Sequence, residues 1–283
     1  MSVRRAINVA AIVISSFGAV GNFTLIAATV RKGSSLRSKT NWLVAMLACL
    51  DLGGCLSQVH AHALMLNGWL LMKQSDCVLA VIPLFFIAFS QSFMILLTGV
   101  DRILMFKTPI SYNAWQTSRY VPAMSAIALA YGVMPISTGL LNASPNKTLA
   151  YCLAPQAMAG WPWKLQIRIT LLIIMLQRIQ RSLVIIAACY VASFAMAVCG
   201  VLISSLLLVD PTDIVNTQLF ASLGILGNFS GNAVILAARS KDYRNEMRVV
   251  LSCGKFNQVH ITTTAAAASN TRRNQQNLVE ARF

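Results

Sequence analysis

Long apolar stretches separated by short basic segments organise the chain. Each is long enough to supply the roughly 20 residues that a helix needs to cross a hydrocarbon core of about 30 Å. Asp51 is the one charged residue inside them. We therefore predict membrane-spanning helices at about residues 6–30, 41–66, 78–100, 120–141, 183–209 and 214–238.

A further crossing is expected between residues 160 and 176, although this segment is short and contains Lys164 and Arg168. Without a crossing here, the basic segment after residue 238 would lie on the outer face, against the positive-inside rule. Two explanations stay open: the fifth helix is short, or a coding segment of roughly 20 residues is missing. The second is preferred. The prediction is an all-α membrane protein, a seven-transmembrane helix bundle whose fifth helix is short or truncated.

Composition and charge support a membrane protein. The chain of 283 residues is 57% hydrophobic and only 11% charged, whereas soluble domains carry about 25% charge. The net charge of +15 does not indicate nucleic-acid binding, because the cations lie between the apolar stretches. Arg31, Lys32, Arg37 and Lys39 place the first connection in the cytoplasm. We expect a multi-pass plasma-membrane protein with an extracellular N-terminus and a cytoplasmic C-terminus, in contact with the lipid bilayer.

The third stretch carries a motif at both ends. Cys77 begins it, Asp101 and Arg102 end it, and Pro109 and Tyr112 follow. This spacing resembles the third transmembrane helix of rhodopsin-like G-protein-coupled receptors. The resemblance implies that Asp101, Arg102, Pro109 and Tyr112 contact a heterotrimeric G protein.

The fine pattern is most similar to nematode serpentine chemoreceptors of the Srsx class. It rests on Gly21-Asn22, the basic segment 36–39, residues 47–52, Asp101-Arg102 and residues 239–244. The resemblance implies a chemosensory receptor in sensory-neuron membranes. Its partners would be an unknown small-molecule or peptide ligand in the outer half of the bundle and a heterotrimeric G protein.

Four polar residues lie within the predicted helices. Asn22, Asp51, Asn228 and Asn232 resemble the polar switch of these receptors. A charged side chain at mid-membrane is costly, so Asp51 is expected to face the bundle and find polar partners. A purely structural carboxylate is the alternative, and the switch is favoured. Asn22 is expected to form a hydrogen bond with a neighbouring helix.

Several positions depart from the family pattern. Ile103 replaces a tyrosine, Asn232 keeps only the asparagine of an Asn-Pro-x-x-Tyr motif, and Leu84 argues against an amine ligand. His60 and His62, near the outer end of the second helix, are expected at the interface, with a ligand or pH role as the alternative.

The predicted outer side carries three further features. The resemblance implies a disulfide between Cys77 and Cys152, and the other cysteines fall in membrane segments or on the inner side. Asn142 and Asn146 begin glycosylation sequons in the same outer loop as Cys152.

An amphipathic helix is predicted after the last crossing. Tyr243, Met247, Val250 and Leu251 recur on one face, which would lie on the inner leaflet. Cys253 follows as a palmitoylation candidate, with a free thiol as the alternative.

The domain prediction is a receptor domain with its juxtamembrane helix at 1–253 and a disordered cytoplasmic tail at 254–283. No enzyme motif is found, and no metal or cofactor is expected, because the three histidines lack partners at metal-ligand spacing. Two alternatives remain open: a small membrane transporter or channel component, and a degenerate receptor that does not signal.

Overall fold

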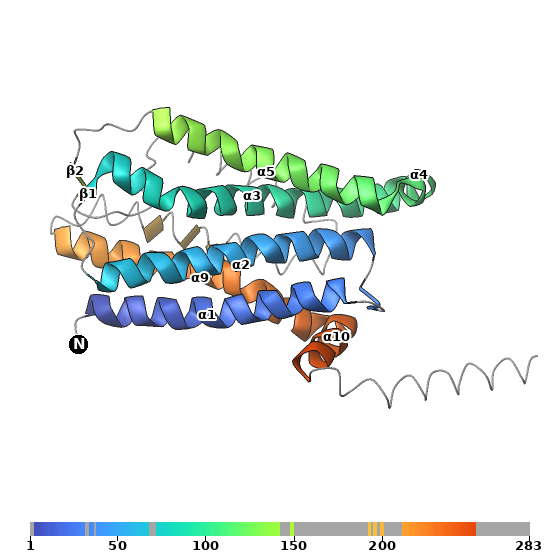
Figure 1. Ribbon diagram of the computed structural model, residues 1–283, viewed down its shortest axis with the longest axis horizontal. Coiled ribbons are helices and arrows are strands. Elements are labelled where there is room, and N and C mark those ends of the chain that lie inside the picture. Colours follow the sequence, from blue (N-terminus) through green and yellow to red (C-terminus); the bar gives the residue numbers. More distant parts are fainter. Residues whose placement is uncertain are drawn as a thin grey trace, which may run out of the picture.

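The computed structural model describes residues 3–31, 34–36, 38–67, 72–141, 148–149, 192–193, 195–196, 199–200 and 211–252. Long helices lie side by side along one direction, and α4 and α10 lie at one end of them (Figure 1). The predicted fifth helix, most of the sixth and the tail at 254–283 lie outside the described residues. The elements are α1 (Val3–Val30), α2 (Lys39–Leu66), β1 (Met72–Lys73), α3 (Gln74–Lys107), α4 (Pro109–Ala114), α5 (Thr117–Leu141), β2 (Thr148–Leu149), α9 (Pro211–Arg239) and α10 (Lys241–Leu251).

The prediction of an all-helical chain is confirmed for the described part. The exception there is the antiparallel pairing of β1 with β2, strands of two residues each. Among the described residues, three helices are long and apolar enough to cross a membrane: Val3–Val30, Lys39–Leu66 and Asp76–Lys107. They coincide with the first three predicted stretches. The α5 and α9 helices coincide with the predicted fourth and last crossings.

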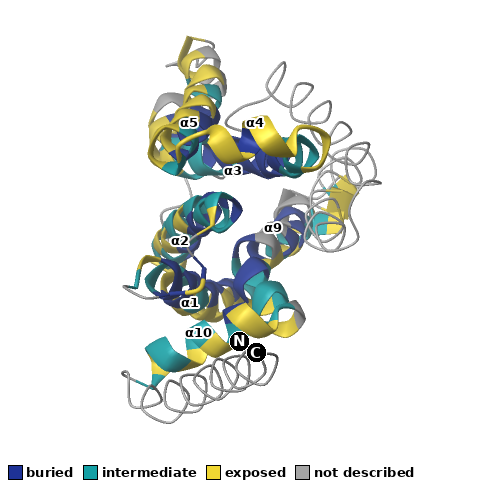
Figure 2. Ribbon diagram, turned by 90° about the vertical axis from the view of Figure 1, so that its right-hand side faces the viewer, coloured by how far each residue is buried: buried dark blue, intermediate teal, exposed yellow. Residues whose placement is uncertain are grey.

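The α1 helix has its polar side chains inside and its apolar side chains outside. Asn8, Ser15, Asn22 and Thr29 recur every seventh position and all are buried. This pattern suits a helix in lipid, where polar groups must find partners within the protein and apolar groups face the acyl chains. Figure 2 shows buried residues on the side of α1 that faces the other helices. Its exposed side chains include Val13, Phe17, Val20 and Phe23.

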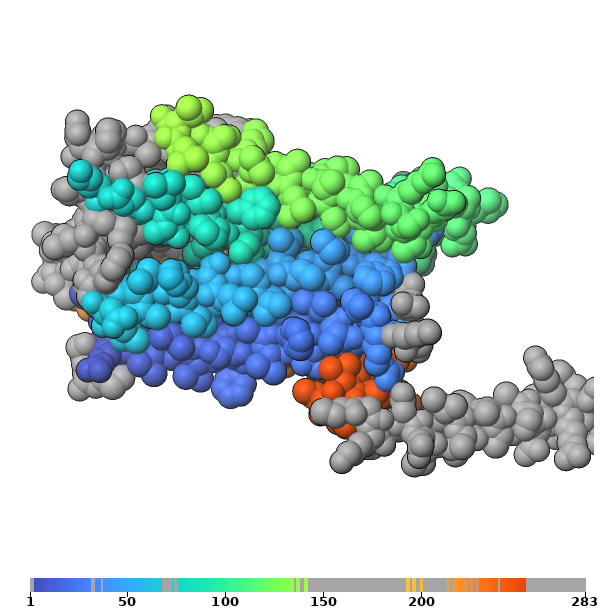
Figure 3. Space-filling model, in the orientation of Figure 1, coloured from blue at the N-terminus to red at the C-terminus, as the bar shows by residue number. Residues whose placement is uncertain are grey.

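Neighbouring helices pack in chain order. The α1, α2, α3 and α5 helices form adjacent bands across the face in Figure 3, and α9 packs against α1 and α2. Leu47 of α2, Met94 of α3 and Met124 of α5 share one apolar cluster. Gly54 allows a close approach, because an added Cβ there would lie 2.6 Å from the Phe229 ring. Small residues at such contacts let membrane helices pack tightly.

Two prolines begin helices. Pro109 is at the start of α4, directly after the Thr108 cap of α3. Pro211 begins α9. Proline is tolerated in the first turn of a helix because its missing N–H would have no intrahelical acceptor there.

The predicted amphipathic helix is α10. The Ser240 side chain caps its first turn by accepting a hydrogen bond from the Tyr243 backbone N–H. Tyr243 is buried, and Met247 and Val250 pack against the same apolar cluster. Leu251, the last residue of the helix, is 66% exposed. The contact of this face with the inner leaflet stays a prediction.

Candidate functional site

The four residues predicted to contact a G protein lie at one end of the bundle, where α1, α3 and α9 end and α2 and α5 begin. We call it the basic end, because it carries Arg31, Lys39, Arg102, Lys107 and Arg119. The opposite end carries Cys77 at the start of α3. Figure 2 looks onto the basic end, with α4 lying across the ends of α3 and α5.

Asp101 is the anchor of the basic end. It is fully buried in α3 and accepts hydrogen bonds from three hydroxyl groups. Thr40 Oγ1 of α2 donates to Oδ2 at 2.8 Å, and Tyr112 of α4 donates to Oδ1 at 2.8 Å. Tyr120 of α5 also donates to Oδ1, at 2.9 Å. A carboxylate only accepts hydrogen bonds, so this one side chain holds α2, α4 and α5 against α3.

Tyr112 is fixed by further contacts on α2. The Lys39 Nζ donates a hydrogen bond to the Tyr112 carbonyl oxygen and lies 4.5 Å from the centre of its ring. Burial and the neighbouring Asp101 carboxylate raise the pKa of the Tyr112 phenol. The phenol therefore stays protonated at neutral pH and remains a donor to Asp101.

Arg102 follows Asp101 directly but makes no ion pair with it or with any other described residue. It is half-buried, and its Nε is enclosed without a hydrogen-bond partner in the described part of the chain. Its positive charge lies within electrostatic reach of the phenols of Tyr112 and Tyr243.

Tyr243 joins α10 to the start of α2. Its hydroxyl group donates a hydrogen bond of 2.9 Å to Asn41 Oδ1. Burial raises the pKa of the Tyr243 phenol, and the nearby Arg102 charge opposes this effect only in part. The protonated phenol thus positions α10 beside Arg102.

A second polar cluster lies in the middle of the bundle. Asp51 is fully buried and accepts hydrogen bonds from Gln91 Nε2 at 2.5 Å and from Asn232 Nδ2 at 2.7 Å. A cavity of about 20 Å³ adjoins it, lined in part by Thr98 and Asn232. Asp51 thus finds the polar partners expected of it, while its role as a switch stays a prediction.

Asn22 makes the interhelical hydrogen bond expected of it, from its Nδ2 to the Phe229 carbonyl oxygen of α9 at 2.8 Å. Asn228 lies in α9, but its side chain is outside the described part. His62 corrects an expectation: it is buried, not interfacial, and its Nδ1 lies 2.8 Å from Asn8 Oδ1 of α1. His60 is exposed, as expected of an interfacial residue.

Cys77 is buried and disulfide-bonded. Its partner is not among the described residues, so the pairing with Cys152 stays a prediction. The β1–β2 ladder supports it by bringing Lys73, shortly before Cys77, opposite Thr148, shortly before Cys152. Two glycosylation candidates and one acylation candidate also lie outside the described residues: Asn142, Asn146 and Cys253.

The sequence did not reveal most of the partners at these two sites. Gln91 is the most polar residue of the uncharged stretch 78–100, and that polarity is the available signal. Lys39, Thr40 and Tyr120 stand at helix starts among other polar residues, so nothing local marks them as partners of Asp101 or Tyr112. In the described ranges, no group of three or more His, Cys, Asp or Glu residues could hold a metal ion.

The membrane-length helices and the Asp101-Arg102 pair near the end of α3 are typical of seven-transmembrane receptors. The family model described as "Serpentine type 7TM GPCR chemoreceptor Srsx" matches residues 15–179, more than half of the chain. The chain therefore belongs to the Srsx family of serpentine seven-transmembrane chemoreceptors. It is a multi-pass membrane receptor and not an enzyme, and its family implies a ligand and a G protein. No curated protein matches the chain.

Proposed function

We propose that this chain is a chemosensory receptor that activates a heterotrimeric G protein. A small-molecule or peptide ligand would bind in the outer half of the bundle. The G protein would bind the basic end, around Arg102. Family membership supports this proposal over a transporter or channel component.

The distribution of charge supports a cytoplasmic basic end in the plasma membrane. Arg31, Lys39, Lys107, Arg119 and Arg244 lie at or next to the helix ends there. Connections rich in Lys and Arg stay on the cytoplasmic side of a membrane. The N-terminus of α1 lies at the other end of the bundle and would be extracellular.

One observation carries the proposal: Asp101 is occupied by three hydroxyl donors while Arg102 has no ion pair among the described residues. A guanidinium presents five N–H donors and keeps its charge at all physiological pH values. Arg102 is therefore available to bind carbonyl or carboxylate groups of a partner. Pro109 would contribute by starting α4, which carries Tyr112 to Asp101.

The Asp51 cluster supports a route from the ligand to this end. It joins α2, α3 and α9 through side-chain hydrogen bonds. A ligand shifts a conformational equilibrium only when it binds one state more tightly than the other. We propose that ligand binding favours a state with altered contacts at Asp51, and that this state presents Arg102 to the G protein.

Reconstitution would test the proposal. The full chain would be placed in lipid vesicles with a purified heterotrimeric G protein and exposed to libraries of small water-soluble molecules and short peptides. Nucleotide exchange by the G protein and uptake into the vesicles would be measured in parallel. We expect a saturable rise in exchange without uptake. Uptake without exchange would contradict the proposal and favour a transporter.

A degenerate receptor is the remaining alternative, and surface delivery separates it from a signalling one. We expect the expressed chain to reach the cell surface and to be glycosylated at Asn142 or Asn146. A chain that stays inside the cell and gives no exchange with any library member would contradict the signalling proposal.

A further inference from the structure

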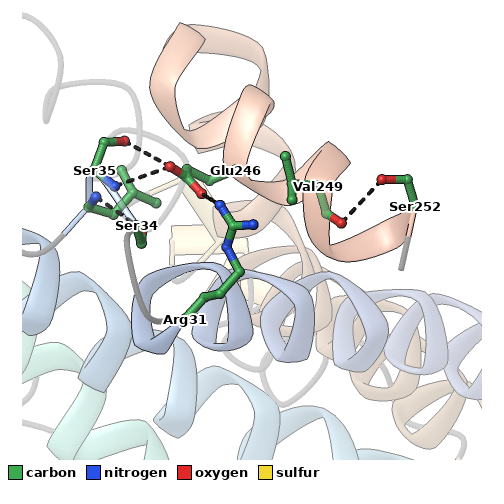
Figure 4. Close-up of polar contacts among 7 residues, drawn as sticks. Arg31, Ser34, Ser35, Glu246, Val249 and Ser252 are labelled. Carbon is green, nitrogen blue, oxygen red and sulfur yellow. Dashed lines mark hydrogen bonds and ion pairs between the residues drawn. The ribbon is translucent and has the colours of Figure 1, made fainter. Parts of the chain in front are cut away.

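A carboxylate on α10 holds the segment that connects α1 to α2. Glu246 Oε2 lies 2.7 Å from the Arg31 Nη2 at the end of α1. Glu246 Oε1 accepts hydrogen bonds from the Ser35 backbone N–H at 3.1 Å and from the Ser35 hydroxyl at 3.0 Å. In Figure 4 Arg31 and Ser35 approach Glu246 from two sides. We call these three residues the Glu246 clasp.

Ser35 is the accessible member of the clasp. It is exposed, and it lies between α1 and α2 outside both helices. Ser34 beside it is only 7% exposed, and its Oγ accepts a hydrogen bond from the Leu36 backbone N–H. An enzyme that modifies a hydroxyl group in this segment would therefore reach Ser35 more readily than Ser34.

The sequence around Ser35 is strongly basic on both sides. Arg31 and Lys32 precede it, and Arg37 and Lys39 follow it. Many protein kinases select substrates by charge pattern, and an acidic substrate groove would recognise cations flanking a serine. The exposed hydroxyl group and its basic surroundings thus point to one kind of modifying enzyme.

We propose that Ser35 is a phosphorylation site for a serine/threonine protein kinase that recognises basic substrates, and that phosphorylation releases α10 from the Glu246 clasp. The proposal rests on the proposed function in one respect: the basic end must face the cytoplasm, where the kinase and ATP are found. It needs neither the ligand nor G-protein coupling.

The reaction is a phosphoryl transfer from ATP. The Ser35 Oγ forms a bond to the γ-phosphorus, and the bond from that phosphorus to the bridging oxygen of ADP breaks. The hydroxyl proton goes to the catalytic base of the kinase. The product carries a charge of about −1.5 to −2 at neutral pH.

This charge would appear within hydrogen-bond reach of the Glu246 carboxylate. Phosphorylation removes the hydroxyl donor at 3.0 Å and replaces it with an anion that repels Glu246. The phosphate also competes for Arg31, because guanidinium groups bind phosphate through paired hydrogen bonds. Glu246 would lose both side-chain partners, and the contact between α10 and the α1–α2 connection would open.

Release of α10 would change the surface around Arg102. Tyr243 of α10 bonds Asn41 and lies within the electrostatic reach of Arg102. When Glu246 is released, α10 is held by fewer contacts and moves more freely beside Arg102. Phosphorylation would thus alter the face proposed for the G protein without touching Arg102.

The first experiment maps the modification. The full chain in lipid nanodiscs would be incubated with ATP and the catalytic domain of a kinase selective for basic substrates, and phosphopeptides would be identified by mass spectrometry. We expect phosphate on Ser35, its loss in Ser35→Ala and its retention in Ser34→Ala. Phosphate that is absent from Ser35, whether it lies on Ser34 or Ser38 alone or is missing from the segment 34–38, would overturn the proposal.

The second experiment measures the release of α10 by hydrogen exchange of its backbone amides. We expect phosphorylation or Ser35→Asp to speed the exchange of the α10 amides by roughly tenfold. The loss of a charge-assisted hydrogen bond shifts a local opening equilibrium by about that factor. Ser118→Asp is the matched control, because Ser118 is exposed at the start of α5 and adds the same charge away from Glu246. Equal effects of the two substitutions would overturn the proposal.

A double-mutant cycle isolates the role of Glu246. Glu246→Gln removes the charge that the phosphate would repel, and by itself it should speed α10 exchange. In this background Ser35→Asp should add less than about a twofold change, because the two positions interact directly. A full, additive effect of Ser35→Asp would overturn the mechanism. If the receptor failed to activate a G protein, these exchange results would be unchanged. The phosphorylation proposal and the proposed function can therefore fail separately.

Discussion

Asn232 on α9 donates a hydrogen bond of 2.7 Å to the carboxylate of Asp51 on α2, 181 positions earlier in the chain. Both residues are buried, and Gln91 of α3 completes the cluster at 2.5 Å. Three helices are thus joined by buried side chains. We therefore expect this cluster to be a sensitive point for stability.

Asn232→Ala should lower the stability of the purified receptor by about 1–3 kcal/mol, the usual cost of leaving a buried polar group without its hydrogen-bond partner. The melting temperature in detergent would measure the loss. Asn245→Ala is the control, because Asn245 is exposed on α10 and should change stability by less than about 0.5 kcal/mol. Equal effects of the two substitutions would refute the importance of the Asp51 cluster.

Gly132→Ala should destabilise the packing of α3 against α5. An added Cβ at Gly132 would lie 2.0 Å from Ser90 Oγ and 2.8 Å from the Phe86 carbonyl oxygen, which is backbone and cannot rotate away. We expect a loss of about 1–3 kcal/mol by the same melting assay. At Gly99, where nothing lies within 4 Å, alanine should be neutral or stabilise by up to about 1 kcal/mol.

Arg102→Ala should abolish G-protein activation while leaving surface expression largely intact. Arg102 makes no ion pair with a described residue, so its removal leaves no buried carboxylate without a partner. Nucleotide exchange and surface labelling would be measured together. Lys107→Ala removes an exposed cation from the same helix end and should lower exchange by no more than about twofold. Signalling that persists in Arg102→Ala would disprove the proposed role.

Tyr243 should keep α10 docked up to about pH 10, the ordinary pKa of tyrosine. Burial raises the pKa of this phenol, so the docked state holds its proton after the released state has lost it. The docking energy is therefore fully present below about pH 10 and is lost as the pH rises further. The difference in tyrosinate absorbance between wild type and Tyr243→Phe would report this titration. A midpoint at the ordinary value would show that the phenol is not buried in solution.

Cys152→Ser should leave a reactive thiol at Cys77 and reduce both surface delivery and ligand response. Cys77 is disulfide-bonded, and loss of a native disulfide typically costs 2–5 kcal/mol in small secreted domains, an order-of-magnitude guide for this outer loop. Thiol labelling after proteolysis would identify the freed cysteine. Labelling that stays absent at Cys77 in this variant would mean that its partner is another residue.

Helix positions followed from local features of the sequence. Four of the six long apolar stretches end at charged residues, as residues 78–100 do at Asp101 and Arg102, and the hydrocarbon thickness sets their length. The inward position of Asp51 also followed, since a carboxylate in lipid must find partners. These inferences need no knowledge of how the helices are arranged in space.

The contacts at the basic end could not be predicted in this way. Thr40, Tyr112 and Tyr120 meet at Asp101 because α2, α4 and α5 converge there, and no local pattern contains that arrangement. Pro109 shows a related limit: a proline after a helix signals an end, but the same residue also suits the start of the next helix.

The three hydrogen bonds that Asp101 accepts limit how the basic end can change its conformation. Thr40 and Lys39 are consecutive residues of α2. Thr40 donates a hydrogen bond to the Asp101 carboxylate of α3, and Lys39 donates one to a backbone carbonyl oxygen of α4. A movement that separates α3 from α2 must also strip donors from a carboxylate sealed off from solvent, and each loss makes the remaining contacts weaker. Intermediate positions are therefore costly, and we expect the basic end to change between discrete arrangements and not continuously.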